Sequence, residues 1–466
     1  MPPPIPLPLG LQSSPGMYGH DAGGRLINAY ADRADEKGKA QFPIRVREGL
    51  ASFATLTGGG AFRGAVSLAP NGYVVAGTVV FKVNSGGGIT NIGSFPGAEP
   101  VFMAANRSDE IILVSDGLRY SIIADVVATI ADTDLPSGVS VTFLDGYFVV
   151  GIADGRFFWN TLDDVTAWAS ADFATAEAIP DGLMVVHARG SELLLFGPSS
   201  IEFWASTGAP FERIPGTLLK NFGLLCRHSV RDINDVPFFV ASDGTVRMLN
   251  GYQPVRISTA DQERDIGGIA DKDTIVATAY SLEGHQYYCL SSPTWTWVYD
   301  ATIGLWHERI SYGETRWRAE GFVNIDGVPA VGDFESALLY ELDPDANDDA
   351  GEHLIWTLRT PPVHAYPNPL GFNALYLDTI PGTGLNSATA ALSDPQVMLD
   401  WSDNGGKTFS DERQASVGAI GEFNKRVVFR RLGQTKEDGR IFRISMSAAV
   451  VRGLLGGAID AELLEP

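Results

Sequence analysis

The side chains best able to do chemistry are dispersed along this chain. Seven histidines lie at positions 20, 187, 228, 285, 307, 353 and 364, and none belongs to an H-E-x-x-H, a G-x-S-x-G or a Cys/His zinc pattern. The glycine clusters Gly58–Gly60 and Gly86–Gly88 lack the Lys-Ser/Thr pair of a phosphate-binding loop. We therefore predict that the protein is not an enzyme and holds no cofactor and no metal ion.

The best candidate for a metal site is an acidic run after residue 342. Its oxygen ligands stand at alternate positions, as at the start of a calcium loop: Asp343, Asp345, Asn347 and Asp349. Asp348 occupies the position where an EF-hand needs glycine, and Leu354 occupies the position of its closing glutamate. The run is therefore predicted to be a solvated turn.

A second motif, Ser402–Phe409, reads S-D-N-G-G-K-T-F. It resembles the Asp-box hairpin of sialidases and other β proteins, with Asn404 in place of the aspartate and Phe409 in place of the tryptophan. In such a turn a short polar side chain bonds nearby backbone amides and the aromatic ring packs beneath, so the motif predicts a fold and no activity. A glycosidase would also need two facing carboxylates, and the 56 acids leave such a pair unidentifiable.

The elements around these motifs are predicted to be strands. From about residue 60, the chain repeats an apolar strand, a tight turn rich in Gly or Pro, and a second apolar strand. The clearest turns are Asp116-Gly117, Asp154-Gly155, Gly197-Pro198-Ser199, Ser242-Asp243-Gly244 and Ser292-Pro293, with weaker copies near Gly77 and Asp333. The five clear turn centres are 38, 44, 45 and 49 residues apart. This spacing is typical of propeller blades, so we predict a β-propeller of six or seven blades over residues 60–342. A pair of sandwiches is the structural alternative.

The rest of the chain is assigned by its composition. Residues 343–353 are rich in acids and turn formers and are predicted to be a linker. Five apolar segments without blade spacing predict a C-terminal β-sandwich over residues 354–466: Ile355–Leu358, Ala374–Leu377, Val397–Trp401, Val427–Arg431 and Ile441–Met446. Residues 1–59 are assigned to an N-terminal arm and the first strands. The arm's start, Pro2–Pro8, favours an extended segment that lies on a neighbour or stays disordered.

Composition and charge exclude several classes of protein. Hydrophobic residues make up 45% of the 466 and charged residues 19%, which excludes a disordered chain and predicts two or more all-β domains. The formal net charge of −22 disfavours a grip on nucleic acid, although DNA could slide past an acidic wall. Cys226 and Cys289 lie in apolar stretches and are expected to be buried free thiols. Neither a signal peptide nor a membrane span is apparent, so synthesis in the cytoplasm is expected.

One cluster of cations stands out against this acidic background. Lys425, Arg426, Arg430 and Arg431 lie in and before the predicted strand Val427–Arg431. Alternation in a strand would place Arg426 and Arg430 on one face and Lys425 and Arg431 on the other. We interpret the four as a candidate partner interface, and the alternative is that they neutralise local acids such as Asp411, Glu412 and Glu437.

Three groups of segments, in order along residues 160–450, carry a resemblance to a known family. The first comprises Trp168, Asp172–Glu177, Pro180–Leu183, Leu193–Gly197, Ile201–Trp204 and Thr207-Gly208. The second comprises Pro210–Gly216, Ser229-Val230, Ser242–Val246 and Asn250–Thr259, and the third Trp401–Arg413 and Lys425–Gly433. Together they resemble the packaged-DNA stabilisation proteins of short-tailed bacteriophages, which are also called tail accessory or tail hub proteins.

The resemblance implies a structural role in a virion tail that is assembled in the host bacterial cytoplasm. It implies a ring of identical subunits, expected to be a hexamer, below the portal and its adaptor. The ring would retain the packaged genome, which passes through without specific binding, and would seat the tail needle and the fibres or spikes. The competing function is a propeller that binds or cleaves carbohydrate, because propellers and Asp-boxes are common in such proteins. A protein that binds DNA directly would instead lose affinity steeply as salt rises.

Overall fold

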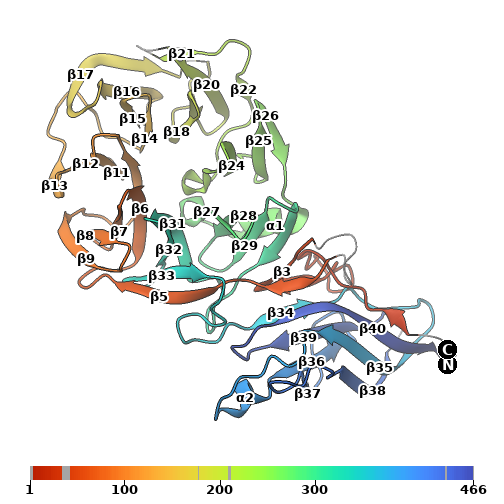
Figure 1. Ribbon diagram of the computed structural model, residues 1–466. Coiled ribbons are helices and arrows are strands. Elements are labelled where there is room, and N and C mark those ends of the chain that lie inside the picture. The colour runs from red at the N-terminus through yellow and green to blue at the C-terminus, as the bar shows by residue number, and fades with distance from the viewer. Residues whose placement is uncertain (1–3, 34–41, 177, 208–210, 436–437, 465–466) are drawn as a thin grey trace.

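The computed structural model describes residues 4–33, 42–176, 178–207, 211–435 and 438–464. These residues form a ring of small sheets and, beside its rim, a sandwich of two sheets (Figure 1). In the described residues the α-helices are α1 (Ala260–Gly268) and the single turn α2 (Ala390–Ser393), and the 3₁₀ turns are η1 (Arg227–Ser229) and η2 (Lys272–Thr274). The predicted all-β fold, a propeller followed by a sandwich, is confirmed.

The ring has seven blades of four antiparallel strands, within the predicted range of six or seven. The first three are β6 (Phe62–Leu68), β7 (Asn71–Ala76), β8 (Val79–Asn84) and β9 (Ile89–Ser94); β10 (Phe102–Ala105), β11 (Ile111–Ser115), β12 (Leu118–Ile123) and β13 (Val126–Thr129); and β14 (Ser140–Leu144), β15 (Tyr147–Gly151), β16 (Arg156–Thr161) and β17 (Asp164–Thr175). The next two are β18 (Val185–Arg189), β19 (Glu192–Phe196), β20 (Ser200–Ser206) and β21 (Phe211–Arg213), with β22 (Leu219–Lys220) beside β20; and β23 (Arg231–Ile233), β24 (Val236–Val240), β25 (Val246–Asn250) and β26 (Gln253–Arg256). The last two are β27 (Val276–Leu282), β28 (His285–Ser291), β29 (Thr296–Asp300) and β30 (Leu305–Glu308); and β31 (Ala319–Ile325), β32 (Val328–Asp333), β33 (Leu338–Asp343) and β5 (Gly49–Thr55).

Each of the seven repeated turns in the sequence is the hairpin between the second and third strands of one blade. In the second blade Asp116 and Gly117 both have positive φ, 46° and 77°, which the right-handed twist of a two-residue hairpin favours. Gly155 has φ 97°, a conformation that side chains with a Cβ rarely adopt. The hairpin period therefore follows from local turn chemistry.

The ring is closed by a segment from far earlier in the chain. Strand β5 pairs with β33 from Leu338↔Thr55 to Asp343↔Gly49, and β31 of this last blade contacts β6 of the first. A strand before residue 60 thus completes a blade that otherwise ends at residue 343. Because neighbouring blades bury their faces against one another, this closure protects the last open face of the ring.

The sandwich also takes strands from both ends of the chain. One sheet has the order β3 (Ala29–Ala31), β4 (Ile44–Val46), β40 (Gly453–Leu463), β35 (Leu370–Thr379) and β38 (Val427–Thr435), and β1 (Ile5–Pro6) also pairs with β40. The other has the order β2 (Arg25–Ile27), β34 (Trp356–Arg359), β39 (Ile441–Met446), β36 (Gln396–Ser402) and β37 (Arg413–Ser416). Buried residues such as Leu26, Trp356, Leu375 and Phe442 form the core between the two sheets.

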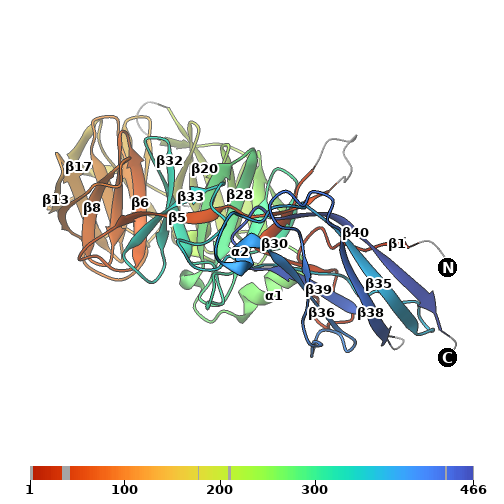
Figure 2. The ribbon, with the colours of Figure 1, turned by 60° about the horizontal axis from the view of Figure 1, so that its bottom comes forward.

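The two domains share a sheet. Strand β2 pairs with β34 of the sandwich on one side and, through Ile27↔Glu308, with β30 of the sixth blade on the other, so that nine strands form one sheet. Figure 2 shows the sandwich projecting from the side of the propeller, with both termini at its far end. The sheets therefore do not follow the linear division into residues 1–59, 60–342, 343–353 and 354–466. In the described part of the arm, which excludes Pro2 and Pro3, Ile5 and Pro6 pair with this chain's own β40.

Candidate functional site

The four predicted interface cations lie on and beside one edge strand of the sandwich. Strand β38 is the outermost strand of its sheet, Lys425 and Arg426 directly precede it, and all four side chains are exposed. The predicted alternation is wrong. Arg431 has φ 57° at an irregularity in the pairing of β38 with β35, and this bulge places both Arg430 and Arg431 in solvent. All four cations are therefore exposed along this edge of the sandwich.

The two sheets meet at this open edge. Arg413 of the neighbouring edge strand β37 donates from Nη1 to the backbone carbonyls of Arg430 (2.8 Å) and Arg431 (3.1 Å). These bonds satisfy acceptors that an edge strand would otherwise offer to another chain, and charged side chains and bulges protect edges in the same way. Edge protection is thus a structural role for the cations that requires no partner.

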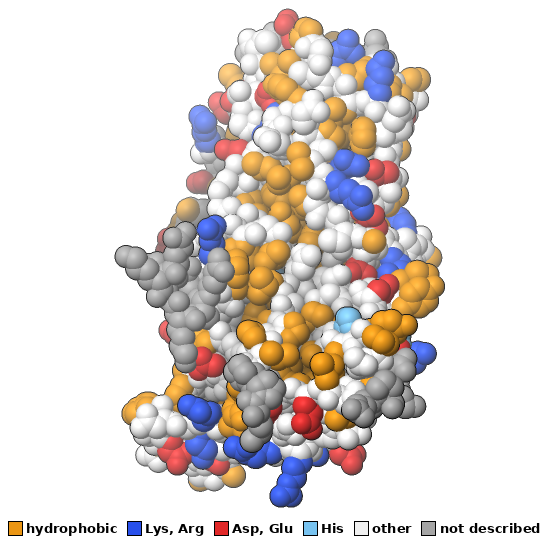
Figure 3. All heavy atoms as spheres, turned by 90° about the vertical axis from the view of Figure 1, so that its right-hand side faces the viewer, with side chains coloured by type: hydrophobic (Ala, Val, Ile, Leu, Met, Phe, Trp, Pro, Cys, Tyr) orange, Lys and Arg blue, Asp and Glu red, His pale blue; other side chains and the backbone are white. Residues whose placement is uncertain are grey.

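Counter-charges at this edge are sparse. Lys425 Nζ lies 3.5 Å from Glu422 Oε2, and within the described chain no ion pair involves Arg426, Arg430 or Arg431. Asp411 and Glu412, which the sequence offers as neutralising acids, pair with none of the four in the described residues, and Glu437 lies outside them. Figure 3 shows Lys and Arg side chains gathering toward the lower end of the molecule, over the sandwich.

An apolar tip adjoins the cations at the end of the sandwich that carries α2. Its most exposed side chains are Phe423 (68%), Ile420 (65%) and Leu385 (46%). The loops that carry them are held together by backbone bonds from Gly382 to Val417 and from Gly384 to Gly418. Residues 380–393 contain no charged side chain. An exposed, nearly uncharged apolar surface with cations beside it has the composition of a protein interface. The sequence did not predict this surface, because its residues come from two separate loops.

The Asp-box segment forms a turn that is stabilised by its own short polar side chains. Ser402 Oγ accepts a hydrogen bond from the Gly406 amide (2.9 Å), and Asn404 Oδ1 accepts from the amides of Lys407 (3.1 Å) and Thr408 (3.0 Å). The ring of Phe409 packs against the guanidinium of Arg443, 4.1 Å from the ring centre. Ser402 and Asn404 are thus used within the turn, as predicted, and Asp403 pairs with Arg440 outside it.

A buried polar network joins the propeller to the sandwich. Arg47 forms a two-pronged ion pair with Asp349, with Nη1–Oδ1 3.0 Å and Nη2–Oδ2 2.6 Å, and both side chains are at most 1% exposed. Arg47 Nε donates to Asn28 Oδ1 (3.0 Å), and Asn28 in turn donates to the carbonyls of Ile310 and Ile355. The network therefore ties the sixth blade to the start of the sandwich. The predicted solvated turn is wrong at Asp349, because this carboxylate is the counter-charge of a buried arginine.

A second buried pair lies beside the first. Arg309 Nη1 lies 2.5 Å from Glu48 Oε1, Tyr280 donates its hydroxyl to the same carboxylate, and the Arg309 guanidinium lies 4.6 Å from the Trp317 ring centre. The nearby imidazole of His307 is fully buried, and burial, reinforced by the charge of Arg309, lowers its pKa well below the ordinary value of 6.5. Breaking such a pair from one side leaves an unpaired charge in a low-dielectric environment, which is strongly destabilising.

The cysteines and the possible metal ligands show no arrangement suited to chemistry in the described residues. Both cysteines are buried free thiols, and burial raises the pKa of each to about 12, which suppresses the reactive thiolate. In the described residues, no group of three or more His, Cys, Asp or Glu side chains could hold a metal ion. No helix in the described chain has the length and apolar character needed to span a bilayer.

Comparison with known proteins gives matches to both domains. The family model described as "Bacteriophage P22 Gp10, beta-propeller" matches residues 26–347, and the model described as "Bacteriophage P22 Gp10, beta-sandwich" matches residues 355–462. The chain is 22% identical over 399 residues to the tail hub protein gp10 of Salmonella phage P22, covering 78% of this chain and 81% of that protein.

Solved structures with a similar ring include the WD40 β-propeller domain of Doa1. That match has a TM-score of 0.41 and 12% identity, and it covers 63% of this chain and 96% of that one. A chain of the mitotic checkpoint complex matches with a TM-score of 0.42 and 11% identity, over 60% of this chain and 89% of that one.

Proposed function

The chain belongs to the bacteriophage P22 Gp10 family of phage tail hub proteins, and from this premise we propose that it joins the portal-adaptor assembly to the distal tail and retains the packaged DNA. The family match carries the proposal. In this role the protein is a structural, non-enzymatic virion component that assembles in the host cytoplasm. Its copies form a ring, a hexamer by the resemblance, that contacts the adaptor above and the needle, fibres or spikes below.

The rigid junction between the two domains is consistent with a protein that resists the force of packaged DNA. Packaged DNA exerts a force on whatever closes the channel, and a hinge between propeller and sandwich would yield to that force. The shared nine-stranded sheet and the buried Arg47–Asp349 pair oppose such a hinge. A net charge of −22 also suits a wall past which DNA moves without being held.

The open edge of the sandwich is our candidate for the contact with a neighbouring copy or the adaptor. A closed ring of identical subunits needs two different complementary patches. Lys425, Arg426, Arg430 and Arg431 supply a cationic patch in an otherwise acidic chain, and the apolar tip around Phe423 adds area that association can bury. The carbohydrate alternative has no comparable support, because Ser402 and Asn404 of the Asp-box bond within their own turn and Asp403 pairs with Arg440.

DNA retention tests the proposal. Filled heads that carry portal and adaptor but lack this protein should release DNA to an added nuclease, and purified protein should lower that release in proportion to the number of heads it occupies. Bovine serum albumin at the same concentration is the control. Release that is unchanged when the protein is bound would contradict a retaining role, and failure to bind the heads would contradict the joining role.

A further inference from the structure

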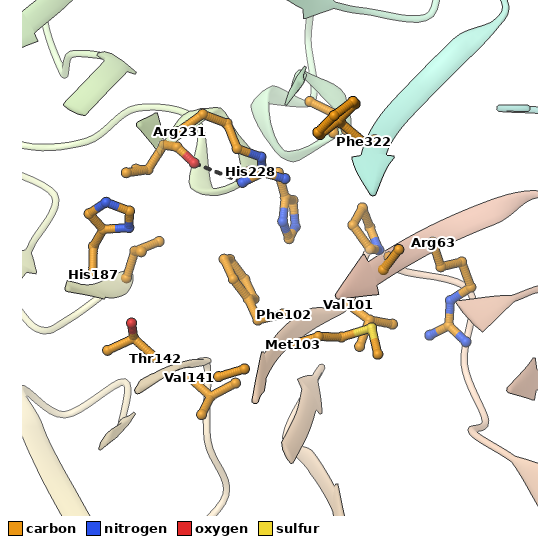
Figure 4. A pocket seen from close by; sticks show the side chains of 18 of the residues that line it. Arg63, Val101, Phe102, Met103, Val141, Thr142, His187, His228, Arg231 and Phe322 are labelled. Atoms are coloured by element: carbon orange, nitrogen blue, oxygen red, sulfur yellow. Dashed lines mark hydrogen bonds between the residues drawn. The ribbon is translucent and has the colours of Figure 1, made fainter. Parts of the chain in front are cut away.

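The centre of the propeller contains a cavity that the proposed function does not use. It has a volume of about 440 Å³ and is lined by the innermost strands of all seven blades: β6, β10, β14, β18, β23, β27 and β31. Its walls combine polar and charged groups with apolar side chains, among them Val101, Phe102, Met103, Val141 and Phe322 (Figure 4). A cavity of this size is within the range of sites that hold small organic ligands.

A buried histidine without a hydrogen-bond partner points into this cavity. His228 is 7% exposed, its ring lies against that of Phe102 with centroids 5.0 Å apart, and it makes no hydrogen bond to the described residues. Burial, followed by the charges of Arg231 and Arg227, lowers its pKa to about 3. The imidazole is therefore neutral, with an N–H donor free to bind a ligand.

Arg231 presents its guanidinium to the same cavity, where burial lowers the pKa of this group and the nearby charges of Asp232 and Glu320 raise it. Within the described chain the Arg231 side chain makes one hydrogen bond, from Nη1 to the Val230 carbonyl (2.7 Å), and forms no ion pair. The two carboxylates that line the cavity contact other residues: Asp232 Oδ2 lies 2.8 Å from His187, and Glu320 lies 2.7 Å from Arg316. The second oxygen of Asp232, Oδ1, is buried and has no hydrogen-bond partner among the described residues. An arginine stays charged inside a protein and has five N–H donors in a planar fork that fits a carboxylate.

We propose that the cavity at the centre of the propeller binds a ligand that combines a carboxylate with an apolar body. Arg231 and His228 donate hydrogen bonds to the carboxylate, and the walls around Phe102 and Phe322 enclose the body. This site is independent of the tail hub function proposed above. The carboxylate belongs either to a small organic acid or to the C-terminus of a peptide, because both present the same group on an apolar residue.

A second cavity beside the site is mainly acidic. It has a volume of about 340 Å³, shares Phe102 and His228 with the central cavity, and is lined by four acids and one cation: Glu99, Asp116, Asp271, Asp273 and Arg227. These acids repel an approaching carboxylate through solvent, where salt screens them, whereas Arg231 acts inside the enclosed cavity. Binding should therefore be faster at physiological salt than at low salt.

Calorimetric titration of the full chain tests the proposal with three probes of similar size that differ in charge: benzoate, benzamide and benzylamine. Benzoate should bind at least about tenfold more tightly than the neutral amide, as expected for a charge-assisted pair, and benzylamine should bind more weakly still. Equal affinities, a preference for benzylamine, or no heat from benzoate at 10 mM would each overturn the proposal. The peptide Gly-Gly-Phe, with a free or an amidated C-terminus, identifies the source: tighter binding of the free peptide than of benzoate favours a peptide terminus, and the reverse favours a small acid.

Two variants locate the site. Arg231→Gln should remove the preference for benzoate over benzamide, leaving the two within about twofold. Arg213→Gln, on the exposed outer strand β21 of the propeller, is the matched control and should leave the preference unchanged. Thermal melting shows whether each variant folds, and if Arg231→Gln does not, His228→Leu should weaken benzoate about threefold or more. Unchanged benzoate affinity in a folded variant at either position would place binding elsewhere and overturn the assignment.

Discussion

The domain junction and the open edge of the sandwich both carry arginines, but in opposite environments. At the junction, Arg47 and Arg309 are fully buried and each is matched to one carboxylate. At the edge, Arg426 and Arg430 are exposed and have no ion pair in the described residues. A buried pair is costly to form and costlier to break, so it fixes the relative position of two domains. An unpaired exposed cation contributes little to folding and is available to a partner. This difference predicts which substitutions will destabilise the folded protein and which will only weaken its association with partners.

The largest effect is expected at the buried pair. Asp349→Ala should leave Arg47 charged and unpaired and lower the free energy of unfolding by about 3–5 kcal/mol. Asp345→Ala, four residues earlier in the same acidic run, is exposed and should change it by no more than about 0.5 kcal/mol. Denaturant unfolding of the two variants gives both values, and similar losses in the two would show that the junction does not depend on this pair.

Acid should weaken the junction and spare the edge. Because burial holds the pKa of His307 well below 6.5 in the folded protein, the unfolded state binds more protons as pH falls below about 6.5. This histidine should therefore remove up to about 1.4 kcal/mol of stability per pH unit below that value, and His228, with a pKa lowered to about 3, should act in the same direction. His285 behaves in the opposite way, because a hydrogen bond to Asp300 raises its pKa. The stability that His285 contributes is therefore fully present at low pH and is lost as pH rises through the raised pKa.

Unfolding measured between pH 5 and 7 separates these contributions. His307→Phe should flatten the slope by up to about 1.4 kcal/mol per pH unit. Arg430→Gln should leave the slope as it is in the wild type, because a guanidinium does not titrate in this range. A wild-type protein whose stability does not fall between pH 6.5 and 5 would contradict the buried, neutral state of His307.

Charge reversal at the edge should have the converse effect. Arg426→Glu together with Arg430→Glu should leave the melting temperature nearly unchanged, because neither side chain is paired in the described structure. Association between copies or with the adaptor should weaken by about tenfold or more at low salt, and by less at physiological salt. Sedimentation at the two salt concentrations measures this difference. Normal association of the double variant under both conditions would remove the cations from the interface and leave edge protection as their role.

The smallest effect is expected at the apolar tip. Phe423→Ser removes a side chain that is 68% exposed, so folding should be unaffected while association weakens about three- to tenfold. Tyr366→Ser is a matched control, since Tyr366 is 73% exposed but lies on a different loop. Equal loss of association in both variants would indicate a general solubility effect.

The sequence predicts best what is local. Asp116-Gly117 and Asp154-Gly155 require their own turn conformations, so the hairpin period and hence the blades could be predicted from neighbouring residues. Strand β5 and the shared sheet could not, because their partners lie hundreds of residues away and nothing local specifies them. Strand β40 was also missed, since its Gly-Leu-Leu-Gly-Gly start has low strand propensity.

The candidate site shows the same limit. A cluster of cations is visible in the sequence, but the bulge at Arg431 that turns two consecutive arginines outward depends on pairing with β35. Asp349 belongs to a run that is acidic and rich in turn formers, which indicates solvent. Its burial depends on Arg47, which is 302 positions earlier in the chain.

Light scattering of the protein mixed with its portal-adaptor assembly tests the central claim most directly. If the chain is a tail hub whose rigid body presents an open edge to its neighbours, the assembly should gain a fixed, whole number of copies and sediment as one species. A protein that is folded and monodisperse, yet adds no mass to the assembly at low or physiological salt, would contradict the account.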